Sequence, residues 1–206
     1  MWTSWRLRLC IVYCLGEQYL FFTYTSDVDR VYIRCIPVNL PDMDLHPVFV
    51  HFPIALLSVY AAVEVVRVPK LVRTSWWFPL KSVLVIIGSV AGVVTFFSGW
   101  LLEQAAEQNG IVPKVMEMHG NFALYTVIVF GVLALAHAVV LLRKYFNEQI
   151  IRVAESILQP WVVIPLAILG LVLITITGSL GGAMVYGPDV DPIVKAVYNL
   201  FVGAGN

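Results

Sequence analysis

The sequence predicts an all-α fold: a four-helix transmembrane bundle built from two similar helical hairpins. Three observations support it, namely the composition, four long apolar segments, and matching motifs at the ends of those segments. Hydrophobic residues make up 60% of the 206 residues and charged residues only 13%, with a mean hydropathy of +0.85. Soluble domains are about 45–50% apolar and about 25% charged. The lipid bilayer is therefore the expected partner of this chain.

Composition and motifs also exclude several functions. The formal net charge is zero and no basic run with interleaved aromatic residues occurs, so no nucleic-acid partner is expected. No nucleophile elbow, nucleotide-binding loop or zincin motif is present, so no enzyme class is predicted beyond a possible redox subunit. The cysteines Cys10, Cys14 and Cys35 precede the apolar body and form only a weak metal or disulfide signal.

Four apolar segments are long enough to cross about 30 Å of hydrocarbon, which takes roughly 20 helical residues. Length rather than periodicity favours helix over strand in runs this apolar. The helices are expected at about residues 47–66, 79–102, 120–142 and 161–185. Aromatic residues typical of membrane interfaces fall at the predicted edges: Trp76, Trp77, Trp100, Trp161 and Tyr186. The loop between the third and fourth segments has the composition of an interfacial helical turn.

Basic residues predict the orientation. Loops one and three and their flanks carry most of the Lys and Arg of the body: Arg67, Lys70, Arg73, Lys81, Arg143, Lys144 and Arg152. The second loop has only Lys114 and the tail only Lys195. The positive-inside rule then makes loops one and three cytoplasmic. We expect a bacterial cytoplasmic-membrane protein in which both termini of the four-helix body are periplasmic.

Residues 1–42 do not fit this pattern. They contain four arginines on the predicted outer side, and Met43 stands directly before the apolar body. We predict that residues 1–42 are an atypical N-terminal extension, not part of the natural product, and that residues 43–206 are the membrane domain. The alternative is that this segment forms a fifth, weakly hydrophobic helix.

The first and third helices begin alike, and the second and fourth end alike. "HFPIALLSV" from His51 and "HGNFALYTV" from His119 share H-x-x-x-A-L-x-[ST]-V, while "SGWL" from Ser98 corresponds to "TGSL" from Thr177. Such parallel repeats are related by an axis along the membrane normal. The sequence therefore predicts that the two histidines lie at similar depth near the outer face, on opposite sides of that axis.

Small residues are expected to line the space around His51 and His119. They are Ala55, Ser58, Ala62, Gly88, Gly92, Thr95, Gly99, Gly178, Gly181 and Gly182. Two opposed imidazoles over a gap lined by glycine suit one b-type haem, or another metal, with His51 and His119 as ligands. The alternative is that histidines at the interface only shape the helix entrances, and that small residues let the helices pack closely.

Secondary candidates surround this pair. His46, followed by Pro47, is expected to be a helix-entry residue. Asn121 and Glu103 could orient an imidazole or relay protons, or belong to a solvated loop face. His137 lies 18 residues after His119, which places it about 27 Å away near the opposite surface. There it is expected to pair with Glu64 or with a backbone carbonyl.

Three motifs resemble one known family. "LHPVFVHFPIALL" from Leu45, "HGNFAL" from His119 and "TGSLGGAMVYG" from Thr177 are similar to the bacterial membrane-protein family catalogued as domain of unknown function 2231. The resemblance covers about residues 44–192. It implies a four-helix inner-membrane protein without an established activity, some of whose relatives are joined to Rieske-type iron–sulfur domains. Family members often continue with "VYxHGVGV", whereas this chain has "VYGPDVDP" and lacks that histidine.

Three functional hypotheses follow. The first is an electron-transfer subunit in which one haem b passes electrons between a quinone pool and a periplasmic redox protein. The second is a non-catalytic membrane scaffold or accessory subunit. The third is a small transporter, which has less support because the sequence indicates no discontinuous helices with buried acidic pairs, and Glu64 is the lone acidic residue within the predicted helices.

Overall fold

The computed structural model describes residues 8–14, 17–25, 31–37, 46–108 and 113–203. Within these ranges, four helices are long and apolar enough to cross a membrane. They are α1 (His46–Val66), α3 (Trp77–Gln108), α4 (Lys114–Leu141) and α6 (Pro160–Tyr186). The predicted all-α transmembrane body is therefore confirmed, with each helix overlapping its expected segment.

The helices extend beyond the apolar segments at two places. α3 runs to Gln108 rather than ending near Leu102, and α4 begins at Lys114 rather than at Gly120. The added residues are largely Glu, Gln, Ala, Lys and Met, which have high helix propensity. Both helices therefore continue beyond the residues that are needed to cross the hydrocarbon layer.

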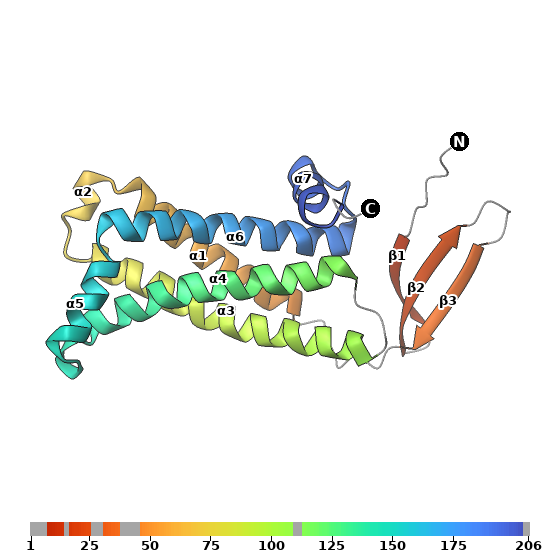
Figure 1. The fold of residues 1–206 in the computed structure, drawn as a ribbon, viewed down its shortest axis with the longest axis horizontal. Helices are drawn as coiled ribbons and strands as arrows, with labels where there is room; N and C mark the ends of the chain where they lie inside the picture. Colours follow the sequence, from red (N-terminus) through yellow and green to blue (C-terminus); the bar gives the residue numbers. More distant parts are fainter. Residues whose placement is uncertain (1–7, 15–16, 26–30, 38–45, 109–112, 204–206) are drawn as a thin grey trace.

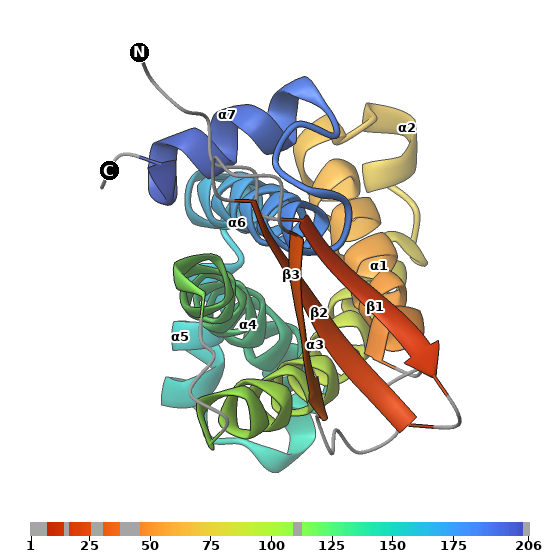
Figure 2. The ribbon, with the colours of Figure 1, turned by 90° about the vertical axis from the view of Figure 1, so that its right-hand side faces the viewer.

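The four helices pack in a ring (Figure 2). α1 packs on α3, α3 on α4, α4 on α6, and α6 on α1, so α1 and α4 occupy opposite corners. Both begin at the end of the bundle that carries α7 (Pro192–Phe201), here called the α7 end. The other end carries α5 (Glu148–Ile157) and is called the α5 end. Because α3 also packs along α4, the bundle is a continuous ring, and the similarity of the two hairpins stays a prediction.

Short helices close both ends of the bundle. At the α5 end lie α2 (Pro69–Val72), the 3₁₀ turn η1 (Arg143–Tyr145) and α5. Asn147 caps α5 by accepting a hydrogen bond from the Ile150 amide, which confirms the helical turn expected in the third loop. α7 was not predicted from the sequence. Its signal is Asp191, whose carboxylate accepts from the Ile193 and Val194 amides, followed by Pro192 in the first turn.

The core is formed by the inward faces of the ring. It consists of Leu57, Tyr60, Val85, Phe130, Leu133, Ala134, Val163 and Ile174. Many large apolar side chains point outward instead, among them Val90, Leu135, Trp161 and Val185. A soluble monomer rarely exposes so much contiguous apolar surface. The helices are therefore suited to a lipid bilayer.

The N-terminal segment is a three-stranded antiparallel sheet in the ranges described, not a fifth helix. Its strands are β1 (Arg8–Cys14), β2 (Glu17–Thr25) and β3 (Val31–Pro37), in the order β1-β2-β3. The register pairs Cys10 with Phe21 and Phe21 with Cys35. β-Branched and aromatic residues, which favour strands, make up most of β2 and β3. The strands lie beyond the α7 end of the bundle (Figure 1).

One glycine fixes the approach of α6 to α4. A Cβ at Gly170 would lie 2.6 Å from Cζ of Phe130, whose side chain is fully buried. We therefore expect Gly170→Ala to lower the free energy of unfolding by about 1–3 kcal/mol, as overpacking does. Thermal unfolding in detergent measures the effect.

Gly131→Ala on α4 is the matched control, because nothing lies within 4 Å of a Cβ at that position. It should leave the unfolding midpoint unchanged or slightly higher. Equal midpoints for the two variants would show that the contact between Gly170 and Phe130 does not set the helix spacing.

Candidate functional site

His119 lies in the first turns of α4 and contacts α6. Its Nδ1 is 2.9 Å from the carbonyl oxygen of Thr177. A carbonyl only accepts hydrogen bonds, so Nδ1 carries the proton and donates it, and the lone pair of the neutral ring is on Nε2. The ring fits because Gly181 has no side chain: a Cβ there would lie 3.3 Å from Cε1 of His119. The "TGSLGG" motif thus provides both the acceptor and the space for this imidazole.

Two secondary candidates lie near His119 with different exposures. The carboxylate of Glu103 lies beside Gly120, where a Cβ would be 3.1 Å from Oε2. Glu103 is half-buried, whereas Asn121 is exposed. The structure therefore brings Glu103 next to the residue that follows His119, and its role in orienting the imidazole stays a prediction.

His51 has a different environment from His119. Its position in α1 corresponds to that of His119 in α4, five residues after the first residue of the helix. Its side chain is exposed, however, as are Ala55 and Ala62, while Leu57 and Tyr60 are buried. The predicted small-residue face of α1 therefore lies away from the core. His46 begins α1, and its side chain lies outside the described residues.

The prediction that Gly88 and Gly92 of α3 border an open gap between the two histidines is wrong, because side chains of α1 pack against them. A Cβ at Gly88 would lie 2.7 Å from Cδ2 of Leu57, and one at Gly92 would lie 3.9 Å from Cβ of Pro53. These glycines accommodate the inward side chains of α1. No gap forms because the large side chains of α1 point into the core and fill the space beside the glycines of α3.

Thr95 also has a packing role that the sequence did not indicate. Pro53 lies inside α1 and has no N–H to donate to the carbonyl of Phe49, one turn earlier. The hydroxyl of Thr95 donates to that carbonyl instead, at 3.4 Å. A hydroxyl from a neighbouring helix commonly satisfies a carbonyl freed by proline within a membrane.

A buried ion pair lies at the α5 end. Glu64 of α1 is fully buried, and its Oε2 is 2.5 Å from Nζ of Lys81 on α3. Nη2 of Arg67 is 3.7 Å from the other carboxylate oxygen. Ionisable groups inside a membrane bundle are costly to bury and are held by such pairing.

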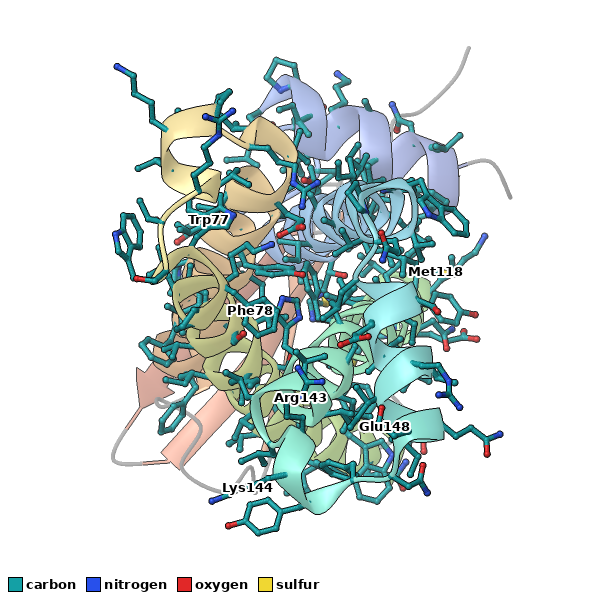
Figure 3. All side chains as sticks on the ribbon, turned by 90° about the vertical axis from the view of Figure 1, so that its left-hand side faces the viewer. Trp77, Phe78, Met118, Arg143, Lys144 and Glu148 are labelled. Carbon is teal, nitrogen blue, oxygen red and sulfur yellow. The ribbon has the colours of Figure 1, made fainter. Side chains whose placement is uncertain are left out.

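His137 packs beside this pair. Its ring is stacked on Phe78, with centroids 5.4 Å apart and planes at 13°, and is edge-on to Tyr60 at 5.5 Å. Nδ1 of His137 donates to the Leu133 carbonyl at 2.9 Å. Of the two expected partners, the backbone carbonyl is the one observed. Figure 3 looks onto this end and shows Phe78 near the centre of the bundle.

The sequence analysis did not predict that Lys81 pairs with Glu64 or that Tyr60 packs against His137. The sequence placed Lys81 in the basic flank of loop one, because the second helix was expected to begin near Pro79. α3 in fact begins at Trp77, so Lys81 lies one turn inside it and reaches Glu64. The sequence does contain a signal for this pair, because a lysine in the first turns of an apolar helix needs an acidic partner.

These features define an integral membrane bundle with an oriented histidine at one end and a buried ion pair at the other. Residues 42–191 match the family described as "Predicted membrane protein (DUF2231)", and the chain belongs to this family, as its motifs predicted. No curated protein and no solved structure matches the chain. Among the described residues, no three His, Cys, Asp or Glu side chains gather into a group that could hold a metal ion.

The ion pair generates a prediction for stability. Lys81→Met leaves the carboxylate of Glu64 buried without its closest cation, and we expect a loss of about 3–5 kcal/mol in unfolding free energy. The Glu64→Leu, Lys81→Met double variant removes both charges and should recover most of that loss. Unfolding of the three proteins in the same detergent tests this. A double variant that is less stable than Lys81→Met would contradict a purely structural pair.

Proposed function

We propose that the chain is a membrane electron-transfer subunit that carries one b-type haem at the α7 end, with His119 as an axial ligand. The observation that supports this is the hydrogen bond from Nδ1 of His119 to Thr177. Histidines that ligate metals usually donate their other ring nitrogen to a carbonyl or carboxylate, which fixes the tautomer and the ring orientation. The haem would supply the one-electron chemistry, and the chain would hold and orient it.

His51 is the proposed second ligand. It lies at the same helical position as His119, on the opposite corner of the ring. Its exposed side chain and the inward packing of Leu57 mean that binding both histidines to one haem requires the first turns of α1 to rearrange. Pro53 weakens the hydrogen bonding of α1 at that point, which lowers the cost of such a change.

The proposal includes a location and partners. The basic residues Arg67, Arg73, Arg143 and Lys144 lie at the α5 end, which supports a cytoplasmic α5 end and a periplasmic α7 end in a bacterial inner membrane. Electrons would then pass between a quinol in the membrane and a periplasmic redox protein near His119.

Absorbance spectroscopy of the purified full-length protein tests the haem. Protein from haem-replete cells should show a Soret band, with split visible bands on reduction, and His119→Ala or His51→Ala should abolish them. A colourless, folded protein, or one that keeps its spectrum after His119→Ala, would contradict the proposal.

Two glycines of α6 provide a matched pair for the ring position of His119. Gly181→Ala places a methyl group against Cε1 of His119 and should lower the haem content severalfold. Gly178→Ala adds the same methyl group where nothing lies within 4 Å, so its haem content should equal that of the wild type. An equal loss in both variants would point to a general effect on α6.

The second candidate function is a non-catalytic scaffold or accessory subunit. The exposed side chain of His51 and the packing of His119 against Gly181 favour it, because both histidines then serve only the helix entrances. This alternative expects a colourless protein, a folded His51→Ala variant, and co-purification with other membrane subunits.

A further inference from the structure

The buried polar atoms without a hydrogen-bond partner all come from one end of the bundle. Among the described residues they are Tyr60 Oη, Glu64 Oε1, Arg67 Nε, Trp77 Nε1 and His137 Nε2. Buried polar groups in folded proteins are nearly always hydrogen-bonded to protein or to ordered water. A cluster of such atoms therefore indicates a bound polar species.

Three of these atoms share one region of the core. The ring of Tyr60 meets His137 edge-on at 5.5 Å, and Glu64 follows Tyr60 by one helical turn. Tyr60, Glu64 and His137 are each at least 99% buried. Side chains of α1 and α4 that carry such atoms thus lie next to one another in the core.

The donors and acceptors in this region suit water. Glu64 Oε1 only accepts, and Nε2 of His137 accepts because Nδ1 carries the ring proton. The Tyr60 hydroxyl can donate or accept. A species that both donates and accepts is needed, and internal water typically makes about three such bonds in a polar site.

The charges around the site come from two helices. α1 contributes Glu64, the residue directly after α1 is Arg67, α3 contributes Lys81, and α4 contributes the titratable His137. α6 has no titratable side chain except Tyr186, at the far end. The site thus holds one carboxylate and two cations.

Arg67 connects this region to solvent. Its side chain is 28% exposed while its Nε is buried. It is also, among the described residues, the non-glycine residue with a positive φ, 36°. Residues held in this conformation are over-determined by their surroundings and cluster at functional sites. Arg67 therefore extends from the buried atoms of this region to the surface at the α5 end.

We propose that this cluster is a hydrated proton-transfer site, in which water joins Tyr60, Glu64 and His137 and reaches the aqueous phase at Arg67. Nε2 of His137 is the proton acceptor. When the Nε2–H bond forms, an O–H bond of the adjacent water breaks, and each water in turn takes a proton from the next. The relay ends at Arg67, where a hydronium ion of the aqueous phase gives up the proton and becomes water. The ring becomes an imidazolium whose Nδ1 still donates to Leu133. This proposal is independent of haem binding.

NMR of the full chain with ¹⁵N-labelled histidine, in detergent or nanodiscs, tests the proposal. The chain has four histidines, and single His→Asn variants assign the ring signals. The His137 signal should show cross-peaks to water, exchange rapidly in D₂O, and move towards the imidazolium position on acidification. A His137 signal that is protected from D₂O and unchanged by pH would overturn the proposal.

Tyr60→Phe gives a second measurement that retains the ring packing. If water bridges the hydroxyl, its removal should lower the thermal midpoint and slow the exchange of the His137 ring proton. If the site is dry, removing an unsatisfied hydroxyl should leave the midpoint unchanged or raise it, which would also overturn the proposal. Tyr125→Phe is the control, because Tyr125 is half exposed and should have no effect on either measurement.

Discussion

In lipid, a polar group of the chain has no solvent to bind, so it needs a partner from the protein or from trapped water. This constraint explains several contacts that look unrelated. The carbonyl freed by Pro53 takes the hydroxyl of Thr95, and Glu64 takes Lys81 from the neighbouring helix. His119 donates to a carbonyl of α6. Each contact joins two adjacent helices of the ring, so the polar residues also fix which faces of the helices meet.

Small residues meet a second requirement of a membrane bundle. The helices must pack closely although lipid provides no strong hydrophobic force that drives them together, and small side chains allow this close contact. Gly170 gives space to Phe130, and Gly88 gives space to Leu57. The sequence shows where such residues are but not which large side chain each one accommodates. This is why Gly88 and Gly92 were expected to border a cofactor, whereas the structure packs α1 against them.

The four spans were largely predictable and the directions of their side chains were not, for one physical reason. Span length and hydropathy depend on each segment alone, so four helices could be placed from the sequence. Side-chain direction depends on the rotation of each helix about its axis, and a helix that is apolar on all sides carries almost no signal for it. The exposed direction of His51 and the reach of Lys81 to Glu64 both depend on that rotation. By contrast, α7 was missed although Asp191 and Pro192 form a recognisable helix start.

The histidines at the two ends of the bundle differ in burial and in their neighbours, so the two ends suit different kinds of chemistry. His119 is half-buried near the end of the helices, and the half-buried Glu103 lies beside the next residue, Gly120, which is why the proposed ligand is placed at this end. His137 is enclosed by Phe78 and Tyr60, with an ion pair next to it, and no bulky group could reach its Nε2 without displacing those rings. These contacts favour a small polar species such as water over a cofactor. A buried imidazole next to a carboxylate with two cations is therefore better suited to proton exchange than to cofactor binding, whatever the function of the opposite end.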